Sequence, residues 1–285
     1  EVAYNLAIPL LFAMTIVGSF SVVYNLTHAM RQRQDTRGPS WGPALAGIGA
    51  SLLVAVLGNL GGGIQLVRRL WSNLTSSLPP EGDAFHVWFW VSSRMIPDQN
   101  SITEFPAWSF LFSDLHAHMI AIPFTILVIG LALALVLTAR SSGFGWRNMA
   151  LPLAALGLTV GSLYAISTWD YPTYLMLAAA AVLLAAYTSR RRLDRGLLAK
   201  AAVGVAVVAG MSYLAFLPFH IRNLTFDAGI HASLEKTSIQ SYLAVHGLFI
   251  VLVVSYLVYE TRRRLKGGVR SIVGWSPFAL TIIGG

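Results

Sequence analysis

The chain contains no cysteine, and charged residues make up only 11% of its 285 residues. Without cysteine there are no disulfides and no thiolate-ligated zinc or iron–sulfur centres. So little charge is not compatible with a soluble globular domain, in which about a quarter of the residues are charged. Hydrophobic residues instead make up 55% of the chain, which predicts a protein that crosses a membrane several times.

Several apolar segments have the length of a membrane span, about 17–25 residues. They predict an all-α, polytopic transmembrane helical bundle of seven to eight spans. The first seven segments are 4–26, 43–60, 119–139, 150–166, 171–187, 198–217 and 242–259. An eighth begins near Ile272 and is too short to span. Because the first residue is not methionine and a span starts at once, we expect residues 1–285 to be one transmembrane domain cut from a longer protein.

Basic residues lie in every second connection between these segments. The connections at 31–37, 140–147, 190–200 and 260–270 hold 15 of the 20 lysines and arginines and three acidic residues. The N-terminal end and the other connections hold five basic and nine acidic residues. Short basic connections stay in the cytoplasm, so the pattern places the N-terminal end outside the plasma membrane. The net charge of +8 thus reflects membrane topology, and we expect no nucleic-acid partner.

The connection at 61–116 is too long for a passive loop, because structureless loops above about 12–15 residues are uncommon in compact domains. Ile64–Trp71 has an apolar face opposite Arg68 and Arg69, a pattern typical of a helix lying in the membrane interface. Aromatic residues at 86–90 favour the same depth. We therefore expect an outer-face interfacial loop with short helices that covers a cleft between spans.

Two carboxylates and two imidazoles precede the third apolar segment within fifteen residues: Glu104, Asp114, His116 and His118. Ionisable groups at a membrane boundary are costly to desolvate, so they tend either to serve a site or to stay hydrated. The Asp-x-His-x-His spacing has the composition of a metal site. We expect the following helix to include these residues, which turns His116 away from Asp114 and His118. That geometry predicts that these residues do not bind a metal ion together. The alternative is that the protein uses a divalent metal ion as a cofactor.

Further polar side chains are predicted on the same outer side. Asp170 lies in the tight turn 168–174, where it either acts together with Asp114 or simply starts a helix before a proline. His220 and Arg222 follow the sixth apolar segment, and Arg94 lies in the long connection. These last three side chains can neutralise a phosphate group. Arg222 is equally well placed to pair with Asp227.

Several motifs in this order resemble one family of membrane proteins. They are Ala3-Tyr-Asn-Leu-Ala7, Ile102-Thr-Glu-Phe-Pro106, Phe110-Leu-Phe-Ser-Asp-Leu-His-Ala-His118, Pro123-Phe124, Thr168-Trp-Asp-Tyr-Pro-Thr-Tyr174, Gln240-Ser-Tyr-Leu243 and His246-Gly-Leu-Phe249. By these motifs the chain is similar to the Chlor-Arch-YYY family of large membrane proteins from archaea and Chloroflexi. The resemblance covers essentially the whole chain, and it implies that the Tyr-Tyr-Tyr region lies upstream.

The resemblance implies a relation to the GT-C class of glycosyltransferases, which use polyprenyl-phosphate sugars at the outer membrane face. By this analogy Asp114 or Glu104 would be the catalytic base, assisted by one of the two neighbouring histidines. Asp170 would stabilise charge, and Arg94, Arg222 or a metal ion would hold the phosphate. The expected partners are membrane lipids and the polyprenyl-phosphate sugar donor.

The alternative is a non-catalytic integral subunit of a larger membrane complex. Such a protein would use its aromatic outer loop and its apolar spans to dock against partner membrane subunits. In that case the acidic side chains would pair internally with Arg94 or Arg222, and no open outward cavity would be needed.

Overall fold

The computed structural model describes residues 2–33, 41–57, 60–75, 89–90, 93–94, 96, 102–190, 194–222 and 236–266. Within them the regular elements are helices, which confirms the predicted all-α membrane fold. The chain divides into two compact units, and each is described by itself. The first unit comprises 1–57 and 105–232, and the second comprises 58–104 and 233–285.

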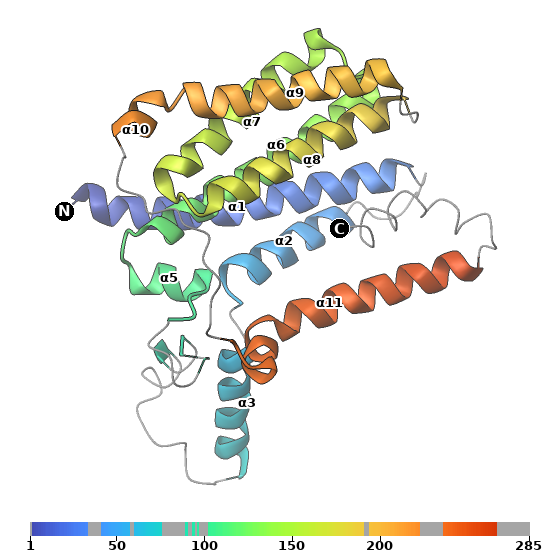
Figure 1. Ribbon diagram of the computed structural model, residues 1–285. Helices are drawn as coiled ribbons and strands as arrows, with labels where there is room; N and C mark the ends of the chain where they lie inside the picture. Colours follow the sequence, from blue (N-terminus) through green and yellow to red (C-terminus); the bar gives the residue numbers. More distant parts are fainter. Residues whose placement is uncertain are drawn as a thin grey trace. The chain divides into compact units, whose positions relative to one another are not determined.

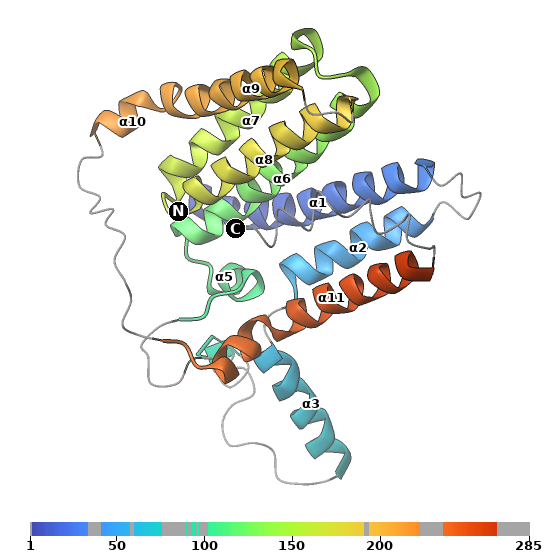
Figure 2. The ribbon, with the colours of Figure 1, turned by 45° about the vertical axis from the view of Figure 1, so that its right-hand side comes forward.

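The first unit is a bundle of helices. Its helices are α1 (Val2–Arg33), α2 (Trp41–Ala55), α5 (Pro106–Phe112), α6 (Ala117–Ser142), α7 (Trp146–Ile166), α8 (Asp170–Arg190), α9 (Arg195–Leu214) and α10 (Leu217–Arg222). Figures 1 and 2 show that α5, α10 and the starts of α1, α6 and α8 gather at one end of this unit. We call it the Tyr4 end, and we call the opposite end, where Arg140 and Arg190 lie, the arginine end.

Six of the described helices are long and apolar enough to cross a membrane: α1, α6, α7, α8, α9 and, in the second unit, α11 (Ile239–Lys266). Helix α2 has only 15 residues, so at 1.5 Å per residue it reaches about 22 Å, short of the roughly 30 Å hydrocarbon core. The predicted second span, 43–60, is therefore wrong at its C-terminal end. The helix stops at Ala55, before Gly58 and Asn59, which are poor helix formers. The eighth predicted segment lies outside the described residues.

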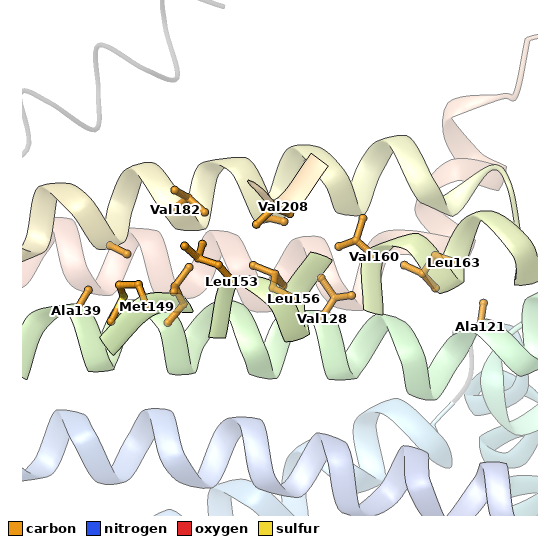
Figure 3. Packing of buried hydrophobic residues seen from close by; sticks show 13 residues of the cluster. Ala121, Val128, Ala139, Met149, Leu153, Leu156, Val160, Leu163, Val182 and Val208 are labelled. Atoms are coloured by element: carbon orange, nitrogen blue, oxygen red, sulfur yellow. The ribbon is translucent and has the colours of Figure 1, made fainter. Parts of the chain in front are cut away.

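The core of the first unit lies where α6, α7, α8 and α9 meet (Figure 3). Its larger apolar side chains are fully withdrawn from solvent, among them Leu135, Leu153, Leu156, Leu163 and Val182. Helix α7 approaches α9 closely through Gly157 and Gly161, which are four residues apart and so share a face. A β-carbon on Gly161 would lie 2.5 Å from the carbonyl oxygen of Ser212. Small residues at crossings matter in lipid, because the hydrophobic effect gives no attraction between helices there.

Helix α1 packs against α2 and α6 by the same means. The ring of Phe20 on α1 packs against Gly47 of α2, where a side chain would otherwise project. In the same way, the side chain of Ile126 on α6 packs against Gly18 of α1. The hydroxyl of Ser51 donates a hydrogen bond to the carbonyl oxygen of Ile16 at 2.9 Å. This bond ties α2 to α1 without leaving a polar group exposed to hydrocarbon.

The second unit contains α3 (Leu60–Thr75) and α11, which contact each other. Helix α3 confirms the helix predicted at Ile64–Trp71. Its exposed apolar side chains fall at helical spacing on one side: Val67, Leu70, Trp71 and Leu74. The depth of this helix in a membrane interface stays a prediction, as do the single domain over 1–285 and the separate outer loop at 61–116.

The glycine contact between α7 and α9 gives a stability prediction. Gly161→Ala is expected to lower the free energy of unfolding by about 1–3 kcal/mol, because the new methyl group overlaps a backbone oxygen that moves only with α9. Gly210→Ala on α9 is the matched control, since nothing lies within 4 Å of its added β-carbon. The control should be as stable as the wild type or slightly more, because alanine is the better helix former. Denaturation in detergent followed by circular dichroism measures both, and equal stability of the two variants would contradict this packing.

Candidate functional site

Four residues between α5 and α6, Ser113–His116, form a segment that we call the Asp114 turn. Ser113 is the C-cap of α5 in the left-handed conformation, with φ 59°. His116 is extended, with φ −111° and ψ 168°, and is the N-cap of α6. The expected helix is therefore wrong for Asp114 and His116, because α6 begins only at Ala117, whereas His118 lies in its first turn as expected. Serine and aspartate favour such turns because their side chains bond to nearby backbone in place of helical hydrogen bonds.

Tyr4, in the first turn of α1, holds the Asp114 turn. Its hydroxyl lies 3.2 Å from Oδ1 of Asp114 and 3.2 Å from the carbonyl oxygen of Ser113. The same hydroxyl accepts a hydrogen bond from the N–H of Leu115 at 3.0 Å. Sequence reasoning missed Tyr4 as a site residue. Its only signal was its place in the motif Ala3–Ala7, which carried the family resemblance.

The two histidines lie side by side at the start of α6. Nδ1 of His116 is 2.7 Å from the carbonyl oxygen of Asp114. A carbonyl oxygen only accepts, so Nδ1 carries a proton. The ring of His118 lies edge-on to that of His116, with centroids 5.8 Å apart. The structure thus brings Asp114, His116 and His118 into one short segment.

A three-ligand metal site is not found among the described residues. The two adjacent imidazoles of His116 and His118 supply two ligands, where a bound metal ion usually needs three or more from the protein. The donor set of the described residues therefore does not fit a resident metal ion, and no chemical step is assigned to one.

Asp170 is the first residue of α8 and lies at the Tyr4 end, as does Asp114. Its N–H donates to the carbonyl oxygen of Ser167 at 3.0 Å, which closes the tight turn after α7. Its half-buried carboxylate makes no hydrogen bond or ion pair with another residue of the described ranges, Asp114 included. Glu104 and Arg94 belong to the second unit, so their place beside the Asp114 turn stays a prediction.

His220 on α10 is held by aromatic rings. Its imidazole packs against Tyr164 with ring centroids 4.0 Å apart and against Tyr213 with centroids 4.4 Å apart. Phe219 and Tyr171 also meet Tyr164 edge-on. We call Tyr164, Tyr171, Tyr213 and Phe219, together with His220, the tyrosine cluster. Nε2 of His220 is buried and has no hydrogen-bond partner in the part of the chain that the structure describes.

This arrangement gives His220 a packing role and leaves its predicted phosphate contact untested. Arg222, two residues further on, is exposed. It makes no ion pair with any residue that the structure describes, and its predicted partner Asp227 lies outside the described residues. Of the predicted phosphate-binding side chains in the first unit, Arg222 is the accessible one.

One family model, described as Uncharacterized membrane protein (DUF2298), matches residues 1–284. The chain belongs to this family. No curated protein and no solved structure matches it. The membrane character implied by the predicted resemblance is confirmed at this level, whereas the Chlor-Arch-YYY name and the relation to GT-C enzymes stay predictions.

The tyrosine cluster of this DUF2298 protein gives a second prediction about stability. His220→Ala is expected to lower the free energy of unfolding by about 1–3 kcal/mol, because it removes a ring from between two tyrosines. His220→Phe keeps the stacking and removes the buried, unpaired nitrogen, so its stability should equal or exceed that of the wild type. Thermal unfolding in detergent measures both. A phenylalanine variant as unstable as the alanine variant would show that the nitrogen, and not the packing, matters.

Proposed function

We propose that this chain is a membrane glycosyltransferase-like protein that acts on polyprenyl-phosphate-linked sugars at the extracytoplasmic face. The observation that carries the proposal is the Asp114 turn, where a carboxylate and two imidazoles lie at one end of a membrane bundle. Carboxylates and imidazoles are common general bases for a hydroxyl proton. A sugar acceptor supplies such a hydroxyl, and a lipid-linked donor reaches this end from the membrane.

In the proposed reaction, the pair Asp114 and His116 takes the proton from the acceptor hydroxyl. The hydroxyl oxygen then bonds to C1 of the donor sugar. The bond between C1 and the phosphate oxygen breaks, and its electron pair leaves with the polyprenyl phosphate. Asp170, at the same end, stabilises the positive charge that develops on the sugar ring. Arg222 neutralises the departing phosphate, and Arg94 and Glu104 are the further proposed contributors from the second unit.

Sugar transfer to an acceptor is the deciding assay for this proposal. Full-length protein in liposomes should convert a radiolabelled polyprenyl-phosphate sugar, and Asp114→Asn should lower turnover at least about a hundredfold, because it removes the carboxylate of the base pair. Asp170→Asn should also lower it strongly.

Asp194→Asn at the arginine end is the matched control for that assay. Asparagine still caps α9 as Asp194 does through the N–H of Leu197, so turnover should be unchanged. Wild-type rates in both site variants would sink the assignment. A protein without turnover that purifies with other membrane chains would instead support the non-catalytic subunit.

The proposed orientation places the Tyr4 end outside the plasma membrane, and it can be tested separately. Because the chain has no cysteine, one introduced cysteine reports its own location without a background signal. Thr173→Cys near the Tyr4 end should react with a membrane-impermeant maleimide in intact cells. Ser142→Cys at the arginine end should react only after the cells are permeabilised. The reverse pattern would invert the topology and move the Asp114 turn to the cytoplasm.

A further inference from the structure

The geometry points to Tyr4 as a positioning residue for the carboxylate of Asp114, an inference that rests on the proposed function of Asp114 as part of the base. Tyr4 does not belong to the predicted site, and it reaches the Asp114 turn from α1, 110 positions earlier in the chain. Its hydroxyl has one proton to donate and two lone pairs that accept. The proton is shared between Oδ1 of Asp114 and the carbonyl oxygen of Ser113, and a lone pair accepts the N–H of Leu115.

The Tyr4 hydroxyl connects the side chain of Asp114 to the backbone that follows it. The hydroxyl donates to Oδ1 of Asp114 at 3.2 Å, and it accepts the N–H of Leu115 at 3.0 Å. That N–H belongs to the planar peptide bond between Asp114 and Leu115. The two hydrogen bonds therefore close a ring that contains Oδ1, the side-chain carbons of Asp114 and this peptide group. Rotation about χ1 or χ2 of Asp114 opens the ring, so one rotamer is favoured.

This ring distinguishes the two oxygens of the carboxylate. Oδ1 accepts the Tyr4 hydroxyl, whereas Oδ2 accepts no hydrogen bond from the residues that the structure describes. Asp114 is exposed, so an acceptor hydroxyl can reach this second oxygen. Oδ2 is then the carboxylate oxygen that meets the acceptor proton, in a direction that the ring sets. Such a direction matters because a general base acts only within hydrogen-bond reach of the proton that it abstracts.

Loss of the Tyr4 hydroxyl should free the carboxylate without unfolding the bundle. Tyr4 is 42% exposed and Asp114 is exposed, so water replaces each bond that is lost. Hydrogen bonds that exchange with water contribute little to folding. Tyr4→Phe removes only the hydroxyl and keeps the aromatic ring. The fold should therefore stay intact while the side chain of Asp114 turns among its rotamers.

Three-bond NMR couplings across χ1 of Asp114 test this positioning without any substrate. They are measured on the full chain in detergent, labelled at aspartate, and Asp114→Asn serves to assign the Asp114 signals. The wild type should show a single χ1 rotamer, and Tyr4→Phe should show couplings averaged over several rotamers. Averaged couplings in the wild type, or a single rotamer in Tyr4→Phe, would overturn the inference.

Sugar transfer separates positioning from a merely structural role. Tyr4→Phe should lower kcat about tenfold with KM within about twofold, because one orienting bond is lost while donor binding is kept. In the Asp114→Asn background, Tyr4→Phe should lower the residual turnover no further, since no carboxylate is left to position. A loss of the same size in both backgrounds would contradict the inference, because a structural defect does not depend on the carboxylate of Asp114.

Tyr24→Phe on the same helix is the matched control. The ring of Tyr24 stacks between Phe20 and His28, and its hydroxyl makes no hydrogen bond with another described residue. Tyr24→Phe should keep both the single rotamer of Asp114 and the wild-type transfer rate. Absence of transfer in every variant would refute the proposed function alone, since the NMR couplings decide the role of Tyr4 by themselves.

Discussion

The hydrocarbon core of a bilayer offers no partner to a backbone N–H or carbonyl, and this constraint governs most of the structure. Long helices such as α1 and α6 satisfy their own backbone along the whole apolar run. Between helices the attraction comes from close packing, which is why Gly161 faces the carbonyl of Ser212 and Gly47 faces Phe20. Some polar groups that remain inside are bonded, as the Ser51 hydroxyl is to α1. Exposed chemistry is thereby confined to the two ends of the bundle.

The two ends of the first unit use their polar residues differently. At the arginine end, Asp194 caps α9 and lies 3.8 Å from Arg190, an arrangement that finishes helices and satisfies charge. At the Tyr4 end, the carboxylate of Asp170 has no such partner among the described residues, and that of Asp114 is held by a tyrosine from another helix. The arrangement at the arginine end is accounted for by helix capping and charge pairing. The arrangement at the Tyr4 end concentrates proton-accepting groups where no helix end needs all of them.

Sequence reasoning succeeded where one physical quantity decides the outcome. An uninterrupted apolar run is needed to cross lipid, so α6, α7, α8, α9 and α11 could be placed to within a few residues. It failed at the end of α2, because hydropathy continues through Val56 and Leu57 while the helix has already stopped. It failed again at the Asp114 turn, where the left-handed Ser113 and the reach of Tyr4 interrupt the helix. The contact with Tyr4 cannot be read from the local sequence, because Tyr4 lies more than a hundred positions before the turn.

His220 and His116 were both predicted as site residues from the sequence, but the structure places them in different surroundings. His220 lies between two tyrosine rings with its Nε2 covered, and the area it buries is sufficient reason for its position. His116 is half-buried in a turn whose Ser113 and Asp114 are exposed, so the hydrogen bonds of the turn gain little against water. An ordered, exposed turn also loses conformational entropy on folding. The hydrogen bonds of the turn hold Asp114 and His116 in one orientation, and a fixed orientation is what the proposed proton-accepting pair needs.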